Sequence, residues 1–298
     1  MEQNLIVALI GGLGGMLGWG FADFFAKKTI DQIGDVVTLF WGQLFGLVPL
    51  SILFFFSRSP IPHKLIANWP YVILLGVWTG LSYIPVYVAF RKGKVSLISP
   101  IQATYSVLVI IALAILFHQI IPFSTLVDFL IIFIGVLFMK IDIHDLLSIF
   151  HGKVIKNRKI NGLKEIIFAN ILYAIWIIAL DKFINGEYWL PYLFVIHTVS
   201  VASIYGYAVL KKINLKITDN SLWKFLIAIG FCDIFAFSAF YYGLSQTSYV
   251  SIVVMLSSAF SLPTIILAHF ALKERITKTQ IAAVITVILG VMALAIQA

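Results

Sequence analysis

The chain has 298 residues, of which 61% are hydrophobic and only 11% are charged, and its mean hydropathy is +1.02. A soluble domain carries about 25% charged residues, so this composition excludes an ordinary globular protein and predicts a chain that lies in lipid. The formal net charge of +8 would suit a nucleic-acid-binding protein, but the basic residues gather in a few short connections, which indicates a membrane protein without a nucleic-acid partner.

Ten apolar segments follow one another along the chain, and each is long enough to cross the roughly 30 Å of hydrocarbon in a bilayer. They lie at 5–26, 36–56, 70–90, 95–117, 123–141, 163–184, 190–210, 222–243, 249–271 and 278–297. Because backbone polar groups in lipid need partners within the chain, each segment should be helical. The sequence predicts an all-α membrane protein with ten transmembrane helices.

The basic residues predict how these helices are oriented. The connections after the first, third, fifth, seventh and ninth segments hold 18 of the 21 Lys and Arg residues, and only Arg58, Lys64 and Lys182 fall on the other side. Basic loops stay in the cytosol. We therefore expect a multi-pass protein of the cell membrane with both termini outside.

An internal repeat divides the chain into two halves. A shift of 155 residues aligns 95–139 with 250–294 without a gap. Five segments per half is an odd number, so the second half should be inverted relative to the first, as in many transporters. We expect a first five-helix repeat at 1–142, a basic cytosolic linker at 143–162 and a second repeat at 163–298.

The same alignment places polar residues at matching positions in the fourth and ninth segments. Ser106 falls on Ser261 and Gln102 falls on Ser257, so each segment carries a polar pair one turn apart. Both serines lie roughly 16 Å from opposite ends of their segments. Since substrates of inverted-repeat transporters bind at mid-membrane between the halves, all four residues are candidate substrate-binding residues.

The ninth segment contains Pro263 and is followed by Leu272-Lys273-Glu274-Arg275-Ile276-Thr277. Together with Trp19-Gly20 and Gly290, these residues resemble the EamA-like members of the drug/metabolite transporter superfamily, and the resemblance covers the whole layout. The first repeat departs from the pattern, with Gln119 in the place of Glu274 and Leu108 in the place of Pro263. The resemblance implies secondary transport of small metabolites or drugs, with the fifth and tenth helices peripheral to a central cavity.

Ionisable residues inside a span are costly and mark functional sites. Asp233 lies roughly 16 Å into the eighth segment, and His197 lies at a similar depth in the seventh. We expect the two to exchange a proton with each other or with the substrate; the alternative is a carboxyl group held by Ser238, a tyrosine or water. Asp128 and His269 lie nearer to span ends and are weaker candidates.

Asp23 and Lys27 are spaced one helical turn apart near the expected cytosolic end of the first segment. The acid precedes the base by four residues, which favours an ion pair on one helix face. We expect a structural ion pair here, with a cytosolic gate as the alternative.

Two aromatic pairs occupy related positions in the halves and are candidates for lining the cavity. Tyr87 aligns with Tyr242 at a shift of 155, and Trp19 aligns with Trp176 at a shift of 157. A buried hydroxyl or indole N–H requires a partner, which a substrate can supply. Simple packing against other helices is the alternative.

Together these features favour a secondary transporter with alternating access around a mid-membrane cavity, proton-coupled, that exports amino acids or drug-like metabolites. Sugar or nucleoside uptake by the same fold is the close alternative; a channel and an intramembrane enzyme are remote ones. The sequence contains no HExxH, Gly-x-Ser-x-Gly or glycine-rich loop followed by Lys-Ser/Thr. We therefore expect a small-molecule substrate and membrane lipids as partners, with no enzymatic activity, cofactor or metal site.

Overall fold

A computed structural model describes residues 2–116, 123–140, 160–184, 188–246, 253, 256, 257, 259–274 and 276–297. Within these ranges the chain is helical and contains no strand. Five helices are long and apolar enough to cross a bilayer, namely α1 (Glu2–Ile33), α2 (Asp35–Ser57), α4 (Trp69–Lys92), α10 (Trp189–Leu210) and α11 (Trp223–Gln246). The other long elements are α7 (Phe123–Lys140), α9 (Leu163–Ile184) and α14 (Lys278–Gln297). The total of ten spans stays a prediction.

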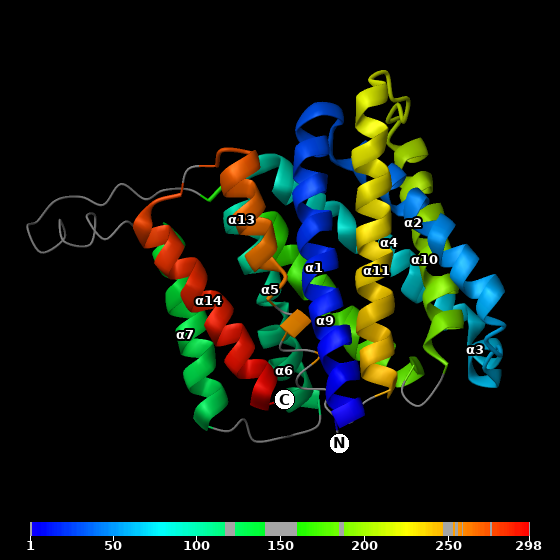
Figure 1. Cartoon of the computed structure of the whole chain (residues 1–298), viewed down its shortest axis with the longest axis horizontal. Helices are drawn as coiled ribbons and strands as arrows, with labels where there is room; N and C mark the ends of the chain where they lie inside the picture. The colour runs from blue at the N-terminus through cyan, green and yellow to red at the C-terminus, as the bar shows by residue number, and fades with distance from the viewer. Residues whose placement is uncertain are drawn as a thin grey trace, which may run out of the picture.

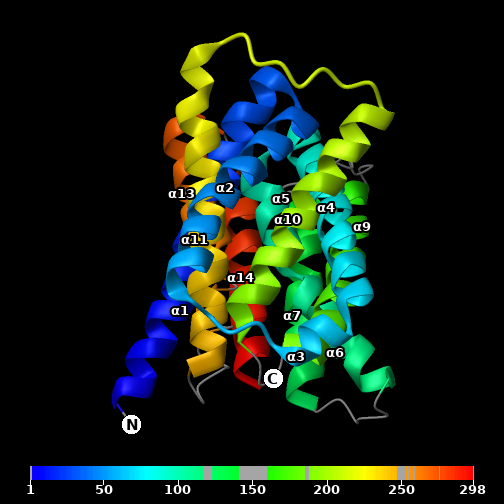
Figure 2. The ribbon, with the colours of Figure 1, turned by 90° about the vertical axis from the view of Figure 1, so that its right-hand side faces the viewer.

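The helices form one bundle with both chain termini at the same end (Figure 1). We call this end the terminal end, and the opposite one the basic end, because α1 finishes there close to Lys27 and Lys28 and the connection after α10 carries Lys211, Lys212 and Lys216. That connection crosses the basic end in an extended form before η1 (Asn220–Leu222) and α11 (Figure 2). The short α3 (His63–Ala67) lies between α2 and α4.

Helices α7 and α14 pack along each other at one edge of the bundle, on the left in Figure 1. On the other side, α2, α4 and α10 pack together, and α1 and α11 lie side by side between these groups. The placement of α7 and α14 at an edge agrees with the peripheral position that the family resemblance implies for the fifth and tenth helices.

Glycines allow three of these helices to touch backbone to backbone. A Cβ atom added to Gly11 of α1 would approach Gly243 Cα of α11 to 2.7 Å, and one added to Gly18 would approach Cys232 O to 2.6 Å. At Gly230 of α11, an added Cβ would meet backbone atoms of α2. Because lipid provides no hydrophobic drive for helix association, close contact through small residues is a main source of packing energy.

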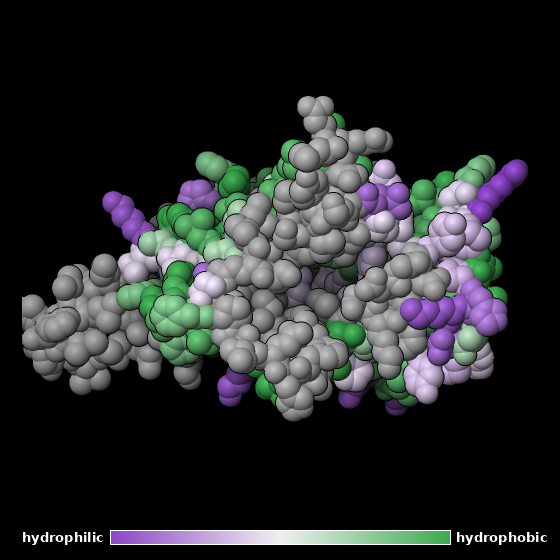
Figure 3. All heavy atoms as spheres, turned by 90° about the horizontal axis from the view of Figure 1, so that it is seen from below, coloured by the Kyte–Doolittle hydropathy of each residue, from purple (hydrophilic) through white to green (hydrophobic). Residues whose placement is uncertain are grey.

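The surface of the bundle is strongly apolar. Phe56, Phe123, Leu210 and Phe270 are each at least 77% exposed. Seen from the terminal end, hydrophobic side chains recur around the outline of the molecule, with hydrophilic ones at a few edges (Figure 3). Monomeric soluble proteins rarely expose apolar surface on this scale, so this is the surface of a multi-pass membrane protein.

The segment predicted as one helix at 95–117 is two helices, α5 (Val95–Ala103) and α6 (Tyr105–Leu116), separated at Thr104. The break is fixed at Ile101 O, which accepts hydrogen bonds from Thr104 N (3.1 Å), Thr104 Oγ1 (2.7 Å) and Asn170 Nδ2 of α9 (2.8 Å). A carbonyl oxygen with these partners no longer serves the regular helical ladder. The interruption is therefore stabilised by a side chain from the second half.

The segment predicted as one helix at 249–271 is interrupted as well. Ser257 is helical, Ala259 and Phe260 form a turn, and α13 (Ser261–Ala271) follows. Ala259 is 155 residues after Thr104, so the two interruptions occupy the same place in the repeat. Interrupted helices at corresponding positions of the two halves are the common indicator of a transporter's binding region.

Replacing Asn170 with Ala should destabilise the protein by about 1–3 kcal/mol, because it removes a buried donor to Ile101 O and to Thr104 Oγ1. The midpoint of thermal unfolding in detergent measures the effect. Asn214→Ala is the matched control, because that side chain accepts one exposed hydrogen bond from Lys216 N in a loop. Equal midpoints for the two variants would show that the break does not depend on Asn170.

Candidate functional site

Two carboxyl groups, the buried Asp233 and the partly buried Asp23, lie at the same depth in the bundle. Helix α1 continues to Ile33 and ends before Gly34, whose φ of 88° leaves the helical region. Asp23 is therefore ten residues, or roughly 15 Å, from the basic end of α1, and Asp233 is equally far from the start of α11 at Trp223. The first helix is seven residues longer than predicted, so Asp23 lies further from its end than the sequence indicated.

Lys27 does not pair with Asp23. Its Nζ lies 2.8 Å from Asp31 Oδ1 and donates to Phe90 O at 2.8 Å, whereas Asp23 Oδ2 accepts a hydrogen bond from Ser99 Oγ of α5 at 3.0 Å. The lysine side chain extends toward the basic end, where Asp31 lies on the next turn of α1 and Phe90 O lies near the end of α4. The expected Asp23–Lys27 pair is thus replaced by two separate contacts, and Asp23 has a neutral partner.

Asp233 and His197 are linked through Gln43 of α2. Gln43 Nε2 donates to Asp233 Oδ2 at 3.0 Å, and His197 Nε2 lies 2.9 Å from the backbone oxygen of Gln43. Since a carbonyl only accepts, Nε2 of His197 carries the hydrogen. All three side chains are at least 95% buried, so this chain of contacts lies inside the bundle, and the two residues expected to interact directly do so through an intermediary.

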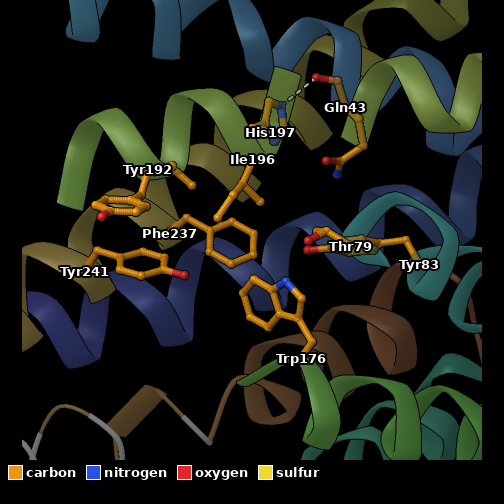
Figure 4. Close-up of a pocket in the computed structure, with 10 residues that line it drawn as sticks. Gln43, Thr79, Tyr83, Trp176, Tyr192, Ile196, His197, Phe237 and Tyr241 are labelled. Atoms are coloured by element: carbon orange, nitrogen blue, oxygen red, sulfur yellow. Dashed lines mark hydrogen bonds between the residues drawn. The ribbon is translucent and has the colours of Figure 1, made fainter. Parts of the chain in front are cut away.

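A pocket opens beside Gln43 and is formed by both halves of the chain (Figure 4). The empty space among its lining atoms, counted together with the open solvent at its mouth, is about 380 Å³. The lining residues come from five helices, α2, α4, α9, α10 and α11. They are Gln43, Thr79, Tyr83, Trp176, Tyr192, Leu193, Ile196, His197, Phe237 and Tyr241. The described lining contains no Lys or Arg.

The lining has an aromatic side and a polar side. In Figure 4 the rings of Tyr192, Phe237 and Tyr241 lie opposite Gln43 and Thr79. Trp176 lies below the space, and its buried Nε1 donates to no protein atom in the described part of the chain. The arrangement offers ring surfaces for stacking and polar groups that can select orientation.

A group of tyrosines lies near the two acids. Tyr83, Tyr87 and Tyr173 are all close enough to both Asp23 and Asp233 to interact with them electrostatically. The rings of Tyr83 and Tyr173 meet edge to face with centroids 5.7 Å apart. The two acids therefore have hydroxyl-bearing rings near them.

In each of the two aromatic pairs proposed from the repeat, the two members lie in different surroundings. Trp176 lines the pocket, whereas Trp19 packs on Phe237 with centroids 5.3 Å apart and does not line it. Tyr87 is buried, but Tyr242 is 42% exposed and faces outward. The expectation for Tyr242 is corrected, because the neighbouring Tyr241 occupies the pocket position and one residue is a rotation of about 100° on a helix.

Three of the four polar candidates of the interrupted helices, Gln102, Ser257 and Ser261, are not among the described residues that line the pocket. Ser257 and Ser261 are buried on either side of the turn at 259–260, so neither faces lipid. Among described residues, Ser261 Oγ and Gln102 Oε1 have no hydrogen-bond partner. Ser106 lies in α6, but its side chain is outside the described set, as are Gln119 and most of the linker at 143–162.

Two other candidates lie away from the pocket. Asp128 is buried in α7 at the edge of the bundle. His269 is exposed near the end of α13, with Nδ1 3.4 Å from Glu274 O. Within the described ranges, no three His, Cys, Asp or Glu side chains gather in a way that could hold a metal ion.

Sequence reasoning missed Gln43, Thr79 and Tyr173. Gln43 carried a usable signal, because it is the one side-chain amide in an otherwise apolar span and such groups in lipid seek partners on other helices. Thr79 and Tyr173 carried none, since hydroxyl groups of spans often bond to their own helix, as Thr79 Oγ1 does with Leu75 O.

The sequence model of the EamA-like transporter family matches residues 6–141 and again residues 161–296. A solved structure described as "Crystal structure of protein" superimposes with a TM-score of 0.63 at 14% sequence identity, over 97% of this chain and 96% of that one. At this identity the likeness concerns the fold alone. No curated protein matches the sequence.

Proposed function

The chain belongs to the EamA-like transporter family, whose members carry small molecules across membranes, and from this premise we propose that it is a proton-coupled secondary transporter exporting amino-acid-like or drug-like compounds. The observation that carries the proposal is a pocket built by helices of both halves, with Gln43 connecting its wall to the buried Asp233. Alternating access requires a site that both halves contact.

Proton coupling is supported by the surroundings of the two carboxyl groups. Asp23 and Asp233 each accept a hydrogen bond from a neutral side chain, Ser99 and Gln43. An ionised carboxylate inside a membrane protein is costly without a positive partner. Binding and release of a proton therefore change the free energy of this region strongly, which is what a coupling site must do.

The conformation supports access from the terminal end. Tyr192 lies near the start of α10 and Tyr241 near the finish of α11, so the pocket extends from mid-bundle toward that end. With basic loops retained in the cytosol, the terminal end and both termini face outward in the cell membrane. In this assignment the halves are 1–142 and 163–298, joined by the cytosolic linker 143–162.

Sugar or nucleoside uptake is the second candidate. It is favoured by the pairing of flat aromatic surfaces with neutral polar groups such as Gln43 and Thr79, since rings stack on sugars and bases while amide and hydroxyl groups bond to their oxygens. The same pocket therefore supports either an amino compound or a polyhydroxylated one.

Reconstituted liposomes with an imposed pH gradient test the proposal. We expect saturable, gradient-driven accumulation of at least one compound from a panel of amino acids, aromatic amines, sugars and nucleosides. Trp176→Ala should raise the KM for that compound, because the variant removes a pocket wall; Trp69→Ala, at an exposed position, is the control. Flux that stays linear in concentration would indicate a channel and reject the proposal, as would new products formed from the panel or no flux at all.

A further inference from the structure

Glu274 connects the second half of the chain to the first at the basic end. Its Oε1 accepts a hydrogen bond from Val95 N at 3.1 Å, and its Oε2 accepts one from Ser96 N at 3.1 Å and another from Ser96 Oγ. Val95 and Ser96 begin α5, which is the first part of the interrupted helix of the first repeat. The carboxylate thus caps a helix that lies 179 residues earlier in the chain.

Helix α5 has no comparable cap of its own. The residue before it, Lys94, makes no side-chain capping hydrogen bond, and the first turn contains no acidic residue. The first N–H groups of any helix lack partners within it, and a negative charge at this position also interacts favourably with the helix dipole. Glu274 therefore supplies both the acceptors and the charge.

The backbone holds Glu274 in place for this contact. Helix α13 finishes at Ala271, Lys273 adopts a φ of 54°, and Glu274 N donates back to Ala268 O at 3.2 Å. The carboxylate consequently moves with α13, the helix that follows the turn in the second repeat. A rigid shift of α13 relative to α5 would break all three contacts together.

A second polar contact between the halves at this end is weaker, because its side chains are exposed to solvent. Lys92 of α4 pairs with Glu165 of α9, and the two side chains are 47% and 25% exposed. Exposed ion pairs contribute little because water screens them. Of these two polar contacts, Glu274 is the one with three bonds to a single helix start.

We propose that Glu274 is a positioning residue for transport: it latches α13 to α5, keeps the basic end closed in this conformation, and releases α5 when that end opens. The inference goes beyond the proposed function, because it assigns a device for closing one end whatever solute is carried. It rests on the proposed function only in one respect: opening of the basic end is understood as a step of transport.

Thiol labelling in lipid nanodiscs tests the latch without a substrate. In a Cys232→Ala background, an Ile98→Cys reporter sits in the first turn of α5 and a Leu190→Cys reporter sits at the terminal end on α10; both positions are buried. Glu274→Ala should raise the maleimide labelling rate at position 98 by roughly tenfold, in line with the loss of a helix cap and its charge. Labelling at position 190 should stay unchanged or fall.

Asp219→Asn is the matched control, because Asp219 also caps a helix start at the basic end, through Ser221 N at 2.8 Å, but only within its own half. It should leave both rates unchanged. Glu274→Gln, which keeps an acceptor and loses the charge, should give an intermediate rate at position 98.

Three outcomes would overturn the latch: no change at position 98, a rise at both reporters, which marks general loosening, or an equal rise in Asp219→Asn. A rise at position 98 alone, combined with no solute flux in liposomes, would leave the latch standing and reject the transport proposal. The two ideas therefore fail separately.

Discussion

Asp233→Asn abolishes proton-driven accumulation while solute exchange down a gradient continues: this is the result we expect in liposomes. The substitution keeps the shape of the side chain and an oxygen that can accept from Gln43 Nε2, so the contact to α2 and the fold should persist. What it removes is the capacity to bind and release a proton in the centre of the bundle.

The size of the effect follows from the driving force. With one proton moved per solute, a gradient of about one pH unit supports roughly tenfold accumulation, because one pH unit corresponds to about 1.4 kcal/mol. The variant should show none. Cys232→Ala, at the adjacent and half-buried position of the same helix, is the control and should behave as the parent. Persistent pH-driven accumulation in Asp233→Asn would assign the proton to another group, with Asp23 the next to test.

Gly230→Ala should destabilise the protein, because α2 and α11 touch backbone to backbone at this glycine. A Cβ atom at this position would lie well under 3.0 Å from Gly46 N, Gly42 O and Phe45 C, all of them backbone atoms of α2. Backbone atoms cannot rotate away as a side chain can, so α2 and α11 must separate. Overpacking of this kind costs about 1–3 kcal/mol, and it also moves Gln43 away from Asp233.

The control for this prediction is Gly206→Ala on α10, where an added Cβ meets nothing within 4 Å. Alanine is the better helix former by about 1 kcal/mol, so Gly206→Ala should be neutral or stabilising. Thermal unfolding midpoints of the two purified variants give the comparison. If Gly230→Ala unfolds at or above the midpoint of Gly206→Ala, the proposed contact between the two backbones is wrong.

Some elements follow from the sequence because lipid leaves the chain few choices. The predicted segments 163–184 and 278–297 coincide with α9 and α14, since long apolar runs in a bilayer must be helical. The end of the first helix was predicted too early, at the charged residues that begin with Lys27; the helix continues to Ile33, and Lys27 pairs with Asp31 on the next turn.

Other features depend on contacts that no local pattern contains. The interruption at Thr104 is stabilised by Asn170 from another helix, so residues 95–117 alone read as one helix. Depth along a helix predicted that Asp233 and His197 lie in one layer, but depth does not give the direction of a side chain around the axis. Gln43 fills the position between them.

The hydrogen bonds that each interrupted helix makes with the other half of the chain have a consequence for biosynthesis. Asn170 of the second half supports Ile101 of the first, and Thr264 Oγ1 donates to Gly20 O of α1 at 3.0 Å. The first amide groups of α5 have no such acceptor until the ribosome adds Glu274, 179 residues after Val95. The N-terminal half therefore leaves the translation machinery with unfinished backbone pairing, and its final structure forms only after nearly the whole chain has been inserted.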